Sequence, residues 1–580
     1  MNQKRPAFLS YLSPSKGLVA LSVVFASLSV VSKLAIPFLA GKAIDLIRSG
    51  LDNPETLQNL AVILYFGLGF CFLGMVFRYA FDYVTSQIGE RLVKTLRDEA
   101  YSSLLRVPVS YLDTHPHGDL LARLTTDVEN VKTGLVTGVG ALYEGIVQIL
   151  ITIGFMFAIN YLLALVVVLL TPISIFVSRF ISSHNAQYFK EQNARMGQIN
   201  AFGLETISSL GAIQSYGIEG ARKSSFSSLN DKARKASFAA TFAATWINPC
   251  TRLVNNIIYG SIVMIGVALL LTSPSFIPAS FSVGGLTAFL TYSNQYMTPF
   301  NEIADAMGEV LVAKASFARV EEAILAPKDV DEGTLPLGET VTTLKAENIT
   351  FGYDSSRSII KDFSLDIYSG HKIALVGTTG CGKTTIINLL MRFYDPQVGG
   401  FLMNGIPTQK IAKKEMRSHI GMVLQDAWLA KATIFENIAF GKEGATKEEV
   451  VAAAKKAHAD DFIRQLPQGY DTVISSDSGL STGQKQLLCV ARILLLAPEI
   501  VLLDEATSNI DLRTELLLSG AFDELMKGKT SIVVAHRLST IQNADLILVM
   551  NGGKIQEQGN FRELMEKNGL FAELYRSQFA

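Results

Sequence analysis

A short segment between an apolar strand and an apolar helix has the composition and spacing of a phosphate-binding loop. It reads Gly377-Thr378-Thr379-Gly380-Cys381-Gly382-Lys383-Thr384 and lies between Ile373–Val376 and Ile386–Met391. The glycines let backbone N–H groups turn inward around phosphate oxygens, and the helix N-terminus adds a favourable dipole. We expect Lys383 to reach the β- and γ-phosphates of ATP, Thr384 to bind Mg²⁺, and Thr385 to complete the segment.

Two carboxylates follow a second apolar strand. Asp504 and Glu505 come directly after Ile500-Val501-Leu502-Leu503. A strand end of this kind presents Asp504 to the Mg²⁺ site and Glu505 to the water that attacks the γ-phosphate. Adjacent acids after an apolar run also occur for purely structural reasons. The prediction of ATP hydrolysis therefore depends on finding both the two acids and the phosphate-binding loop in one domain.

These motifs belong to a region of alternating strands and helices. Residues 344–580 are predicted to form an α/β domain, and a short polar linker, residues 326–343, precedes it. The apolar runs Ile532–Val534 and Leu546–Val549 resemble the strand at 373–376, as expected for a buried parallel sheet.

Residues 1–325 carry long uncharged apolar runs instead. The runs are Leu18–Ser32 with Leu34–Gly41, Thr56–Phe77, Gly145–Ser178 and Leu253–Asn301. The last two are too long for one crossing of a bilayer, which takes about 20 residues. Breaks at Asn160-Tyr161 and at residues 273–278 divide each into two. The sequence therefore predicts six membrane-spanning helices.

The distribution of Lys and Arg predicts the orientation. Residues 90–132 hold six of them and residues 179–235 hold eight, whereas the connections 49–55, 160–161 and 273–283 hold none. Basic connections remain in the cytoplasm, so both ends of the membrane region are expected there. Apolar residues recur at helical spacing in the two basic segments, which predicts helices that continue beyond the bilayer; the alternative is disordered loops.

The composition excludes several classes of protein. The 580 residues contain 51 Lys and Arg against 52 Asp and Glu, a formal net charge of −1, which argues against a nucleic-acid partner held by a basic field. Four cysteines exclude a disulfide scaffold. The first residues, MNQKRPAFLSYLSPSK, have no cleavable apolar segment, so we expect membrane entry through the spans themselves.

The chain resembles the ATP-binding cassette (ABC) proteins. Leu480-Ser481-Thr482-Gly483-Gln484 stands upstream of Asp504-Glu505, where that family has its signature motif, and Tyr111-Leu112-Asp113 with Gly118–Leu124 and Asp127-Val128 resembles its first intracellular loop. The resemblance covers nearly the whole length and implies a half-size exporter. The implied fold is a polytopic α-helical membrane domain of the type I exporter fold followed by an α/β P-loop NTPase ABC domain.

The resemblance also assigns roles to matching residues. It implies that Tyr353 stacks on adenine, that Gln425 contacts Mg²⁺ or water, and that His536 contacts the γ-phosphate and orients Glu505. It places Ser481, Thr482, Gly483 and Gln484 against the nucleotide of an opposite subunit, and Asp511 at the dimer interface. Thr384, Gln425 and Asp504 are then the expected Mg²⁺ ligands. Two ATP molecules are held between two such domains, so the chain is expected to dimerise.

Three departures from the family pattern lie on the signature side. Thr482 replaces the usual glycine, Asn509 replaces the usual alanine, and the segment 475–479 is shortened and lacks a glutamate. This division resembles the hydrolysis-competent subunit of heterodimeric bacterial multidrug exporters. A homodimer that has drifted from the pattern is the alternative.

In the membrane half, the family places coupling helices near residues 110–121 and 207–218. Ionisable and amide side chains within spans indicate a pathway for cargo. Arg78 and Asp82 are one turn apart and are expected to pair. The candidates for a substrate cavity are Lys33, Arg252, Asn256, Gln295 and Glu302. Their alternative role is local pairing or extension to the membrane surface. Cys381 fits as an ordinary small residue of the loop, with a redox role as the alternative.

The resulting expectation is an ATP-driven exporter of lipophilic or amphipathic compounds in a bacterial-type cytoplasmic membrane. Lipid flippases and peptide exporters share these motifs. An importer of the same fold and a regulatory or channel-like member that binds ATP without turnover are further alternatives. Glu505 and His536 argue against the last of these, because such a protein does not need them.

Overall fold

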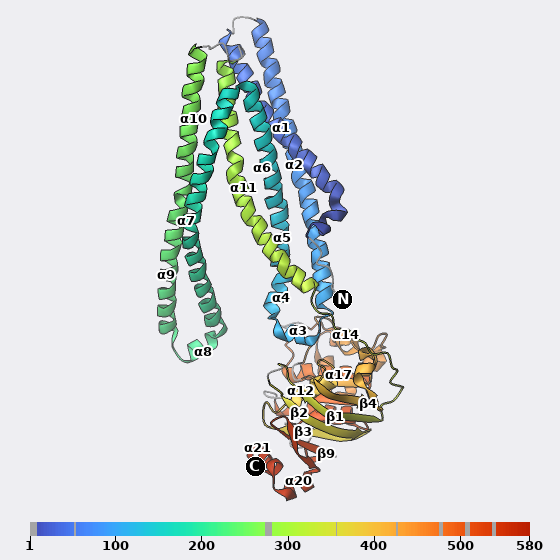
Figure 1. The fold of residues 1–580 in the computed structure, drawn as a ribbon. Helices are drawn as coiled ribbons and strands as arrows, with labels where there is room; N and C mark the ends of the chain where they lie inside the picture. The colour runs from blue at the N-terminus through green and yellow to red at the C-terminus, as the bar shows by residue number, and fades with distance from the viewer. Residues whose placement is uncertain are drawn as a thin grey trace. The chain divides into compact units, whose positions relative to one another are not determined.

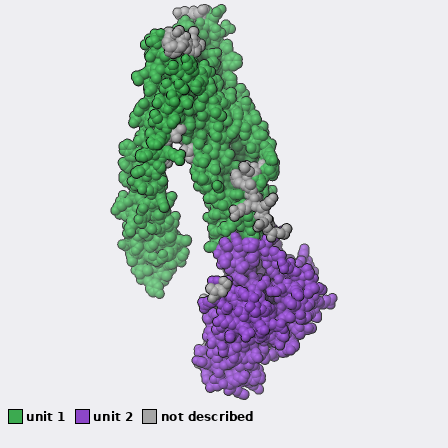
Figure 2. All heavy atoms as spheres, in the orientation of Figure 1, with its two compact units in different colours: residues 1–105, 116–326 green, residues 106–115, 327–580 purple. Residues whose placement is uncertain are grey.

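The computed structural model describes residues 8–50, 54–272, 281–354, 357–424, 427–474, 479–504, 511–535 and 541–579. The chain divides into two compact units (Figure 2). The first comprises residues 1–105 and 116–326, and the second comprises residues 106–115 and 327–580. Residues 106–115 therefore group with the second unit, although their neighbours on both sides belong to the first.

The first unit is built from helices in the residues that are described (Figure 1). Most of its helices are far longer than the average helix of a soluble protein. They are η1 (Phe8–Ser15), α1 (Lys16–Arg48), α2 (Pro54–Leu104), α4 (His117–Leu124), α5 (Thr126–Thr133), the π-helix η2 (Gly134–Val139), α6 (Gly140–Ile159), α7 (Tyr161–Ser208), α8 (Leu210–Ser215), α9 (Glu219–Thr245), α10 (Ile247–Thr272) and α11 (Val283–Ile324).

Four helical stretches of the described residues are long and apolar enough to cross a membrane. They are Ser13–Arg48, Pro54–Leu104, His117–Ile159 and Arg252–Thr272. The two other predicted spans fall on α7 and α11, and each of these includes side chains outside the described residues. Six spans therefore stay a prediction for those two helices.

The predicted break at Asn160 is confirmed. α6 ends at Ile159 and α7 begins at Tyr161. The Oδ1 atom of Asn160 accepts hydrogen bonds from the backbone N–H groups of Leu162 (3.0 Å) and Leu163 (3.1 Å). These bonds satisfy N–H groups that the first turn of a helix leaves without partners. The predicted cytoplasmic extensions are helical as well, since α2 continues to Leu104 and α7 to Ser208.

Small residues let the helices of the first unit approach closely. A Cβ atom added at Gly134 would collide with the Cβ of Ala313 and lie 2.8 Å from the carbonyl oxygen of Glu309 on α11. One added at Gly138 would lie 2.8 Å from Cγ2 of Val310. Membrane helices associate through such contacts because lipid supplies no hydrophobic driving force between them.

The second unit contains two sheets. One is antiparallel, in the order β2-β1-β4-β5, and the other has the order β10-β9-β3-β8-β7-β6, parallel except for β10. The strands are β1 (Thr343–Phe351), β2 (Ile360–Tyr368), β3 (Lys372–Gly377), β4 (Val398–Met403), β5 (Ile406–Pro407), β6 (Ile420–Val423), β7 (Ile500–Asp504), β8 (Thr530–Val534), β9 (Leu546–Asn551) and β10 (Lys554–Gly559).

The second unit also contains short and medium-length helices. They are α3 (Val109–Thr114), α12 (Lys383–Leu390), η3 (Thr408–Lys410), α13 (Lys413–Ser418), α14 (Ile434–Ala439), α15 (Lys447–Lys456), α16 (Asp460–Gln465), η4 (Gly469–Asp471), α17 (Thr482–Leu496), α18 (Leu512–Met526), α20 (Phe561–Lys567) and α21 (Leu570–Phe579). Residues of the predicted linker pack with this unit, because the backbone N–H groups of Thr334 and Leu335 both donate to the carbonyl oxygen of Lys410.

Successive residues of β7 point into two different hydrophobic cores. Ile500 and Leu502 belong to a core with α12 and the antiparallel sheet, whereas Val501 and Leu503 belong to a core with α14, α15, α17 and α18. Side chains alternate between the two faces of a strand. Helices α12 and α17 therefore lie on opposite faces of the six-stranded sheet.

The close contact at Gly134 predicts an unusual cost for a small substitution. Gly134→Ala is expected to lower the free energy of unfolding of the first unit by about 1–3 kcal/mol, because the added methyl group has no room beside Ala313. The midpoint of thermal unfolding in lipid nanodiscs measures this. Gly154→Ala is the control: nothing lies within 4 Å of its added Cβ, and alanine favours helix over glycine. Equal midpoints for the two variants would contradict the packing described here.

Candidate functional site

Four of the predicted site segments follow the carboxyl ends of neighbouring parallel strands. The phosphate-binding loop follows β3, Gln425 comes two residues after β6, Asp504 ends β7, and His536 comes two residues after β8. In a parallel sheet these ends meet at one edge, where ligands bind. Gln425, Glu505 and His536 themselves lie outside the described residues. The strands that lead to them are hydrogen-bonded in register, with Asp504 opposite Val534 of β8.

The phosphate-binding loop has the backbone that its glycines predict. Gly377 and Gly382 have φ angles of 156° and 104°. A Cβ atom at Gly377 would collide with the carbonyl oxygen of Met550 on β9, and one at Gly382 would collide with Ile360 on β2. The tight turn thus needs glycine for both its conformation and its surroundings. Thr378, Thr379 and Gly380, at the tip of the loop, are exposed.

Lys383 folds back over this loop. Its Nζ atom donates to the carbonyl oxygens of Gly377 (2.8 Å) and Thr378 (3.1 Å), and the side chain is buried. The ammonium group is thereby held at the mouth of the loop, where a phosphate oxygen would replace these carbonyl groups. The Sγ atom of Cys381 lies 3.8 Å from Nζ and is 3% exposed, so Cys381 fills space inside the loop.

Thr384 and Asp504 supply oxygen ligands on one edge of the sheet. Thr384 is the second residue of α12 and is exposed, and Asp504 is the partly buried last residue of β7. Hydroxyl and carboxylate oxygens are the ligands that Mg²⁺ prefers. These residues therefore fit the Mg²⁺ ion predicted for the site. Thr385, which follows Thr384, is buried and faces Tyr353, with 3.4 Å between the two hydroxyl oxygens.

Tyr353 is half-exposed and fixed beside α12. Its hydroxyl also accepts a hydrogen bond from Nδ2 of Asn388 (3.3 Å), and its ring lies edge to face against Tyr394, 4.9 Å between centroids. Tyr394 in turn donates a hydrogen bond to Asp113 of α3. Burial, together with this hydrogen bond, raises the pKa of Tyr394, so its hydroxyl remains a donor.

Sequence reasoning missed Tyr394. It lies in a turn after α12, and no motif distinguishes it from the other tyrosines of the chain. Its significance comes from contacts with residues 281 positions earlier and 41 positions earlier, which only the fold brings together. The predicted short helices of the intracellular loops do form, as α3 and α4 in the first loop and as α8 in the second.

The signature segment begins a helix through a capping box. The Oγ atom of Ser481 accepts from the backbone N–H of Gln484 (3.2 Å), and Oε1 of Gln484 accepts from the backbone N–H of Ser481 (2.9 Å). Thr482 is the exposed first residue of α17, and Gly483 is buried. The N-terminus of this helix is suited to an anion.

Asp511 caps a different helix. Its Oδ1 atom accepts a hydrogen bond from the backbone N–H of Thr514 (3.0 Å) at the start of α18. Hydrogen bonds from Thr514 lower the pKa of the Asp511 carboxyl below its usual value. Asn509 and residues 475–478, which carried two of the three departures, lie outside the described residues.

The phosphate-binding loop and the signature segment belong to opposite faces of the sheet. Cys381 and the helix α12 pack into one core, while Leu480 and α17 pack into the other. The loop and the signature segment of one chain are therefore anchored in different cores.

The candidate cavity residues are spread over three helices of the first unit. Lys33 on α1, Arg252 and Asn256 on α10, and Glu302 on α11 are exposed, and Gln295 on α11 is half-buried. Within the described part of the chain, no two of these five side chains bond to each other. The expected pair of Arg78 and Asp82 does form, with 3.1 Å between Nε and Oδ2.

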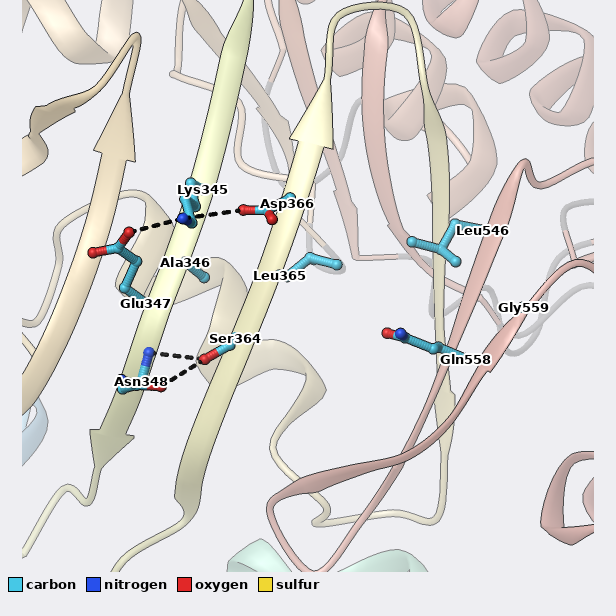
Figure 3. A pocket seen from close by; sticks show the side chains of 10 residues that line it. All are labelled: Lys345, Ala346, Glu347, Asn348, Ser364, Leu365, Asp366, Leu546, Gln558 and Gly559. Carbon is cyan, nitrogen blue, oxygen red and sulfur yellow. Dashed lines mark hydrogen bonds and ion pairs between the residues drawn. The ribbon is translucent and has the colours of Figure 1, made fainter.

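A cavity of about 800 Å³ in the second unit is unrelated to this site. It is lined by residues of β1 and β2, by Leu546 at the start of β9 and by Gly559 at the end of β10 (Figure 3). Leu546 is at the amino end of the parallel strands, opposite the edge that carries the phosphate-binding loop. Its lysine, Lys345, is already paired with Glu347 (3.0 Å) and Asp366 (3.8 Å).

Comparison with known proteins agrees with this geometry. Residues 19–300 match the family described as the ABC transporter transmembrane region, and residues 360–508 match the family described as ABC transporter. The chain is 34% identical to the uncharacterised ABC transporter ATP-binding protein YfiC of Bacillus subtilis, over 98% of this chain and 93% of that protein.

Two further similar proteins have names that state a transported compound or an exporter family. A fatty acid ABC transporter ATP-binding/permease protein of Mycobacterium bovis is 36% identical over 84% of this chain and 76% of its own length. The solved structure of a bacterial Atm1-family ABC exporter with ATP bound has a TM-score of 0.78, is 26% identical, and covers 97% of this chain and 98% of that one.

The ring contact of Tyr353 predicts a role for Tyr394 in ATP binding. Tyr394→Ala is expected to raise the Kd for ATP by about two- to tenfold, because an edge-to-face aromatic pair contributes about 0.5–1.5 kcal/mol. Tyr394→Phe keeps the ring and should leave the Kd unchanged. Fluorescence titration with an ATP analogue measures both values. Tyr368→Ala, an exposed tyrosine on β2, is the control. An unchanged Kd for Tyr394→Ala would show that Tyr353 is positioned without it.

Proposed function

The chain belongs to the ABC transporters as a half-size exporter with one membrane region and one ATP-hydrolysing region, and on this premise we propose that it exports amphipathic or lipophilic compounds as one subunit of a dimer. The observation that carries the proposal is the gathering of the phosphate-binding loop, Asp504 and the strand leading to His536 at one edge of the sheet.

Each residue of the site has a separate role in ATP binding or hydrolysis in this proposal. The loop N–H groups and Lys383 hold the β- and γ-phosphates, and Tyr353 stacks on the adenine. Thr384, Gln425 and Asp504 would hold Mg²⁺, which would supply positive charge beside the phosphate oxygens. Glu505 polarises the attacking water, and His536 orients Glu505 and contacts the γ-phosphate.

The separation of the two motifs supports a dimer. Because α12 and α17 lie on opposite faces of the sheet, a complete site needs the signature of a second chain. In that arrangement Ser481, Thr482, Gly483 and Gln484 complete the site of the partner, and Asp511 lies at the interface between the ATP-binding regions.

The membrane region supports export of apolar or amphipathic cargo. α2 exposes apolar side chains along its predicted span, which suits contact with lipid or a partner helix. The similar mycobacterial protein is named for fatty acids, which are amphipathic. Lys33, Arg252, Asn256, Gln295 and Glu302 then provide polar groups along the cargo pathway. We place the protein in a bacterial cytoplasmic membrane, with the termini and the ATP-binding region in the cytoplasm.

Coupling between ATP and cargo passes through α3 in this proposal. Its Asp113 holds Tyr394, and Tyr394 contacts the ring that stacks on adenine. ATP binding therefore fixes a chain of contacts that begins in the first intracellular loop. The helix α8 of the second loop is the other expected coupling helix.

We further propose that the partner is a different chain. Thr482 adds a side chain at the exposed start of α17, where the family usually has glycine. The residues on the loop side of the site, Lys383, Thr384, Asp504 and Glu505, match the family pattern. Hydrolysis is then expected at the site that uses this chain's Glu505 with the partner's signature. The other site binds ATP without efficient turnover.

The assignment of Glu505 as the general base predicts a specific loss. Glu505→Gln should reduce the kcat of ATP hydrolysis by at least about 10²-fold, because a general base contributes about 10²–10⁴-fold. The Kd for ATP should remain within about twofold of wild type, because a general base acts on the water and not on nucleotide binding. Phosphate release and nucleotide binding by the purified native complex measure the two quantities. Glu448→Gln, an exposed carboxylate on α15, is the control. Turnover at the wild-type rate in Glu505→Gln would remove Glu505 from this role.

The heterodimer predicts the composition of the native complex. Native mass spectrometry of the complex, isolated from its own host through a tag on this chain, should give two different subunit masses. The partner is expected to lack the glutamate that corresponds to Glu505 and to carry an unaltered Leu-Ser-Gly-Gly-Gln. A single repeated mass would mean a homodimer with two equivalent sites.

A further inference from the structure

An apolar cavity of about 160 Å³ lies among α1, α2, η2 and α6 in the first unit. Phe81 and Ile88 of α2, Val136 and Val139 of η2, and Val19 of α1 contribute to its wall. Three hydroxyl groups also line it. Ser22 donates to the carbonyl oxygen of Val19 and Thr85 to that of Phe81 (both 2.8 Å), while the Tyr143 hydroxyl is hydrogen-bonded to that of Ser27 on α1 (2.9 Å). All three hydroxyl groups thus already have partners in the protein. The cavity is therefore suited to hydrocarbon.

The π-helix η2 shapes this cavity. Gly134 and Gly138 are pressed against α11, while Leu135, Val136 and Val139 line the cavity. A π-helix is rare and is found mostly at functional sites, because its wide turn redirects side chains. Here it allows one segment to pack closely on α11 and still leave space toward α1 and α2.

A charged cluster borders the cavity. Arg78 on α2 pairs with Glu144 on α6, with 2.5 Å between Nη1 and Oε2, and with Asp82. The guanidinium carbon of Arg78 lies 5.5 Å from the ring centroid of Phe81, which lines the cavity. Glu144 directly follows Tyr143, another lining residue. The hydrophobic wall and the ionic cluster thus share two neighbouring helices.

The cluster has a net charge of −1, since it holds one cation and two carboxylates. The side chain of Asp82 is 55% exposed and bonds to Arg78 through Oδ2, while Glu144 accepts two bonds from Arg78. Arg78 is the first charged residue after the uncharged run Thr56–Phe77. A charge in such surroundings is costly unless it is paired.

We propose that this cavity and cluster bind an amphipathic cargo with a positive charge. The hydrocarbon part enters the cavity, and the cationic group takes a place beside Asp82 and Glu144, which relieves the excess negative charge. This inference rests on the proposed export function and narrows its cargo by charge. An anionic head group would meet two carboxylates and is disfavoured.

The test compares three amphiphiles that share one tail. The native complex is reconstituted in nanodiscs of zwitterionic lipid and exposed to decyltrimethylammonium, decyl maltoside and decyl sulfate below their micelle-forming concentrations. Stimulation of ATP hydrolysis and displacement of a fluorescent cationic amphiphile are both measured. The cation should act at a concentration at least about tenfold lower than the sulfate, and the maltoside should fall between them.

Two variants locate the effect. Asp82→Asn should remove most of the preference for the cation, and Val139→Trp should weaken all three amphiphiles by filling the cavity. Asp82→Asn leaves the Arg78–Glu144 pair intact, so it is not expected to unfold the helices. Asp231→Asn, an exposed carboxylate on α9, is the control and should behave as wild type.

The outcomes separate this inference from the proposed function. Stimulation by all three amphiphiles without a charge preference, or a preference that survives Asp82→Asn, would overturn the cationic site and leave export intact. A lack of displacement by any of the three would also overturn the site, whatever the ATPase rate. The proposed export function is tested separately. Transport that continues at the wild-type rate in Glu505→Gln would overturn it.

Discussion

The arrangement of the ATP-binding region depends on the alternation of side chains along its buried parallel strands. In β7 and β8, neighbouring residues enter two different cores, one with α12 and the other with α14, α15, α17 and α18. Both faces of the sheet must be apolar for this to happen, and the runs Ile500–Leu503 and Ile532–Val534 satisfy that need. As a result, the phosphate-binding loop and the signature segment are held on opposite faces. This separation is the basis of the proposal that a second chain completes the ATP site.

The membrane region follows a different physical rule. Its predicted spans are long uncharged apolar runs, and in lipid the burial of apolar surface does little to choose the neighbours of such helices. Close contacts at small residues do so instead, as at Gly134 and Gly138 against α11. At another crossing, Gly41 of α1 meets Gly284 of α11, and the carboxylate of Asp45 accepts a hydrogen bond from the backbone N–H of Gly284 (2.8 Å). Such contacts depend on shape, so they are sensitive to single methyl groups.

The helix α3 connects the two kinds of structure. It lies in the chain between two helices of the membrane region, yet it groups with the ATP-binding unit. Its Asp113 accepts a hydrogen bond from Tyr394, whose ring contacts Tyr353 beside the phosphate-binding helix. A neutral tyrosine is needed as the donor, and burial keeps it neutral. Contacts thus run from α3, which lies by sequence within the membrane half, to a ring beside the helix that follows the phosphate-binding loop.

The sequence alone was enough to predict the phosphate-binding loop, the strand that ends in Asp504, the break at Asn160 and the pairing of Arg78 with Asp82. Each of these depends on residues close together in the chain, where backbone preference, helix spacing and glycine geometry decide the outcome. The tertiary structure alone decided the opposite placement of α12 and α17, the contact of Tyr394 with Asp113 and Tyr353, and the cavity beside η2. These depend on residues tens to hundreds of positions apart, and local patterns carry no information about which distant surfaces will pack together.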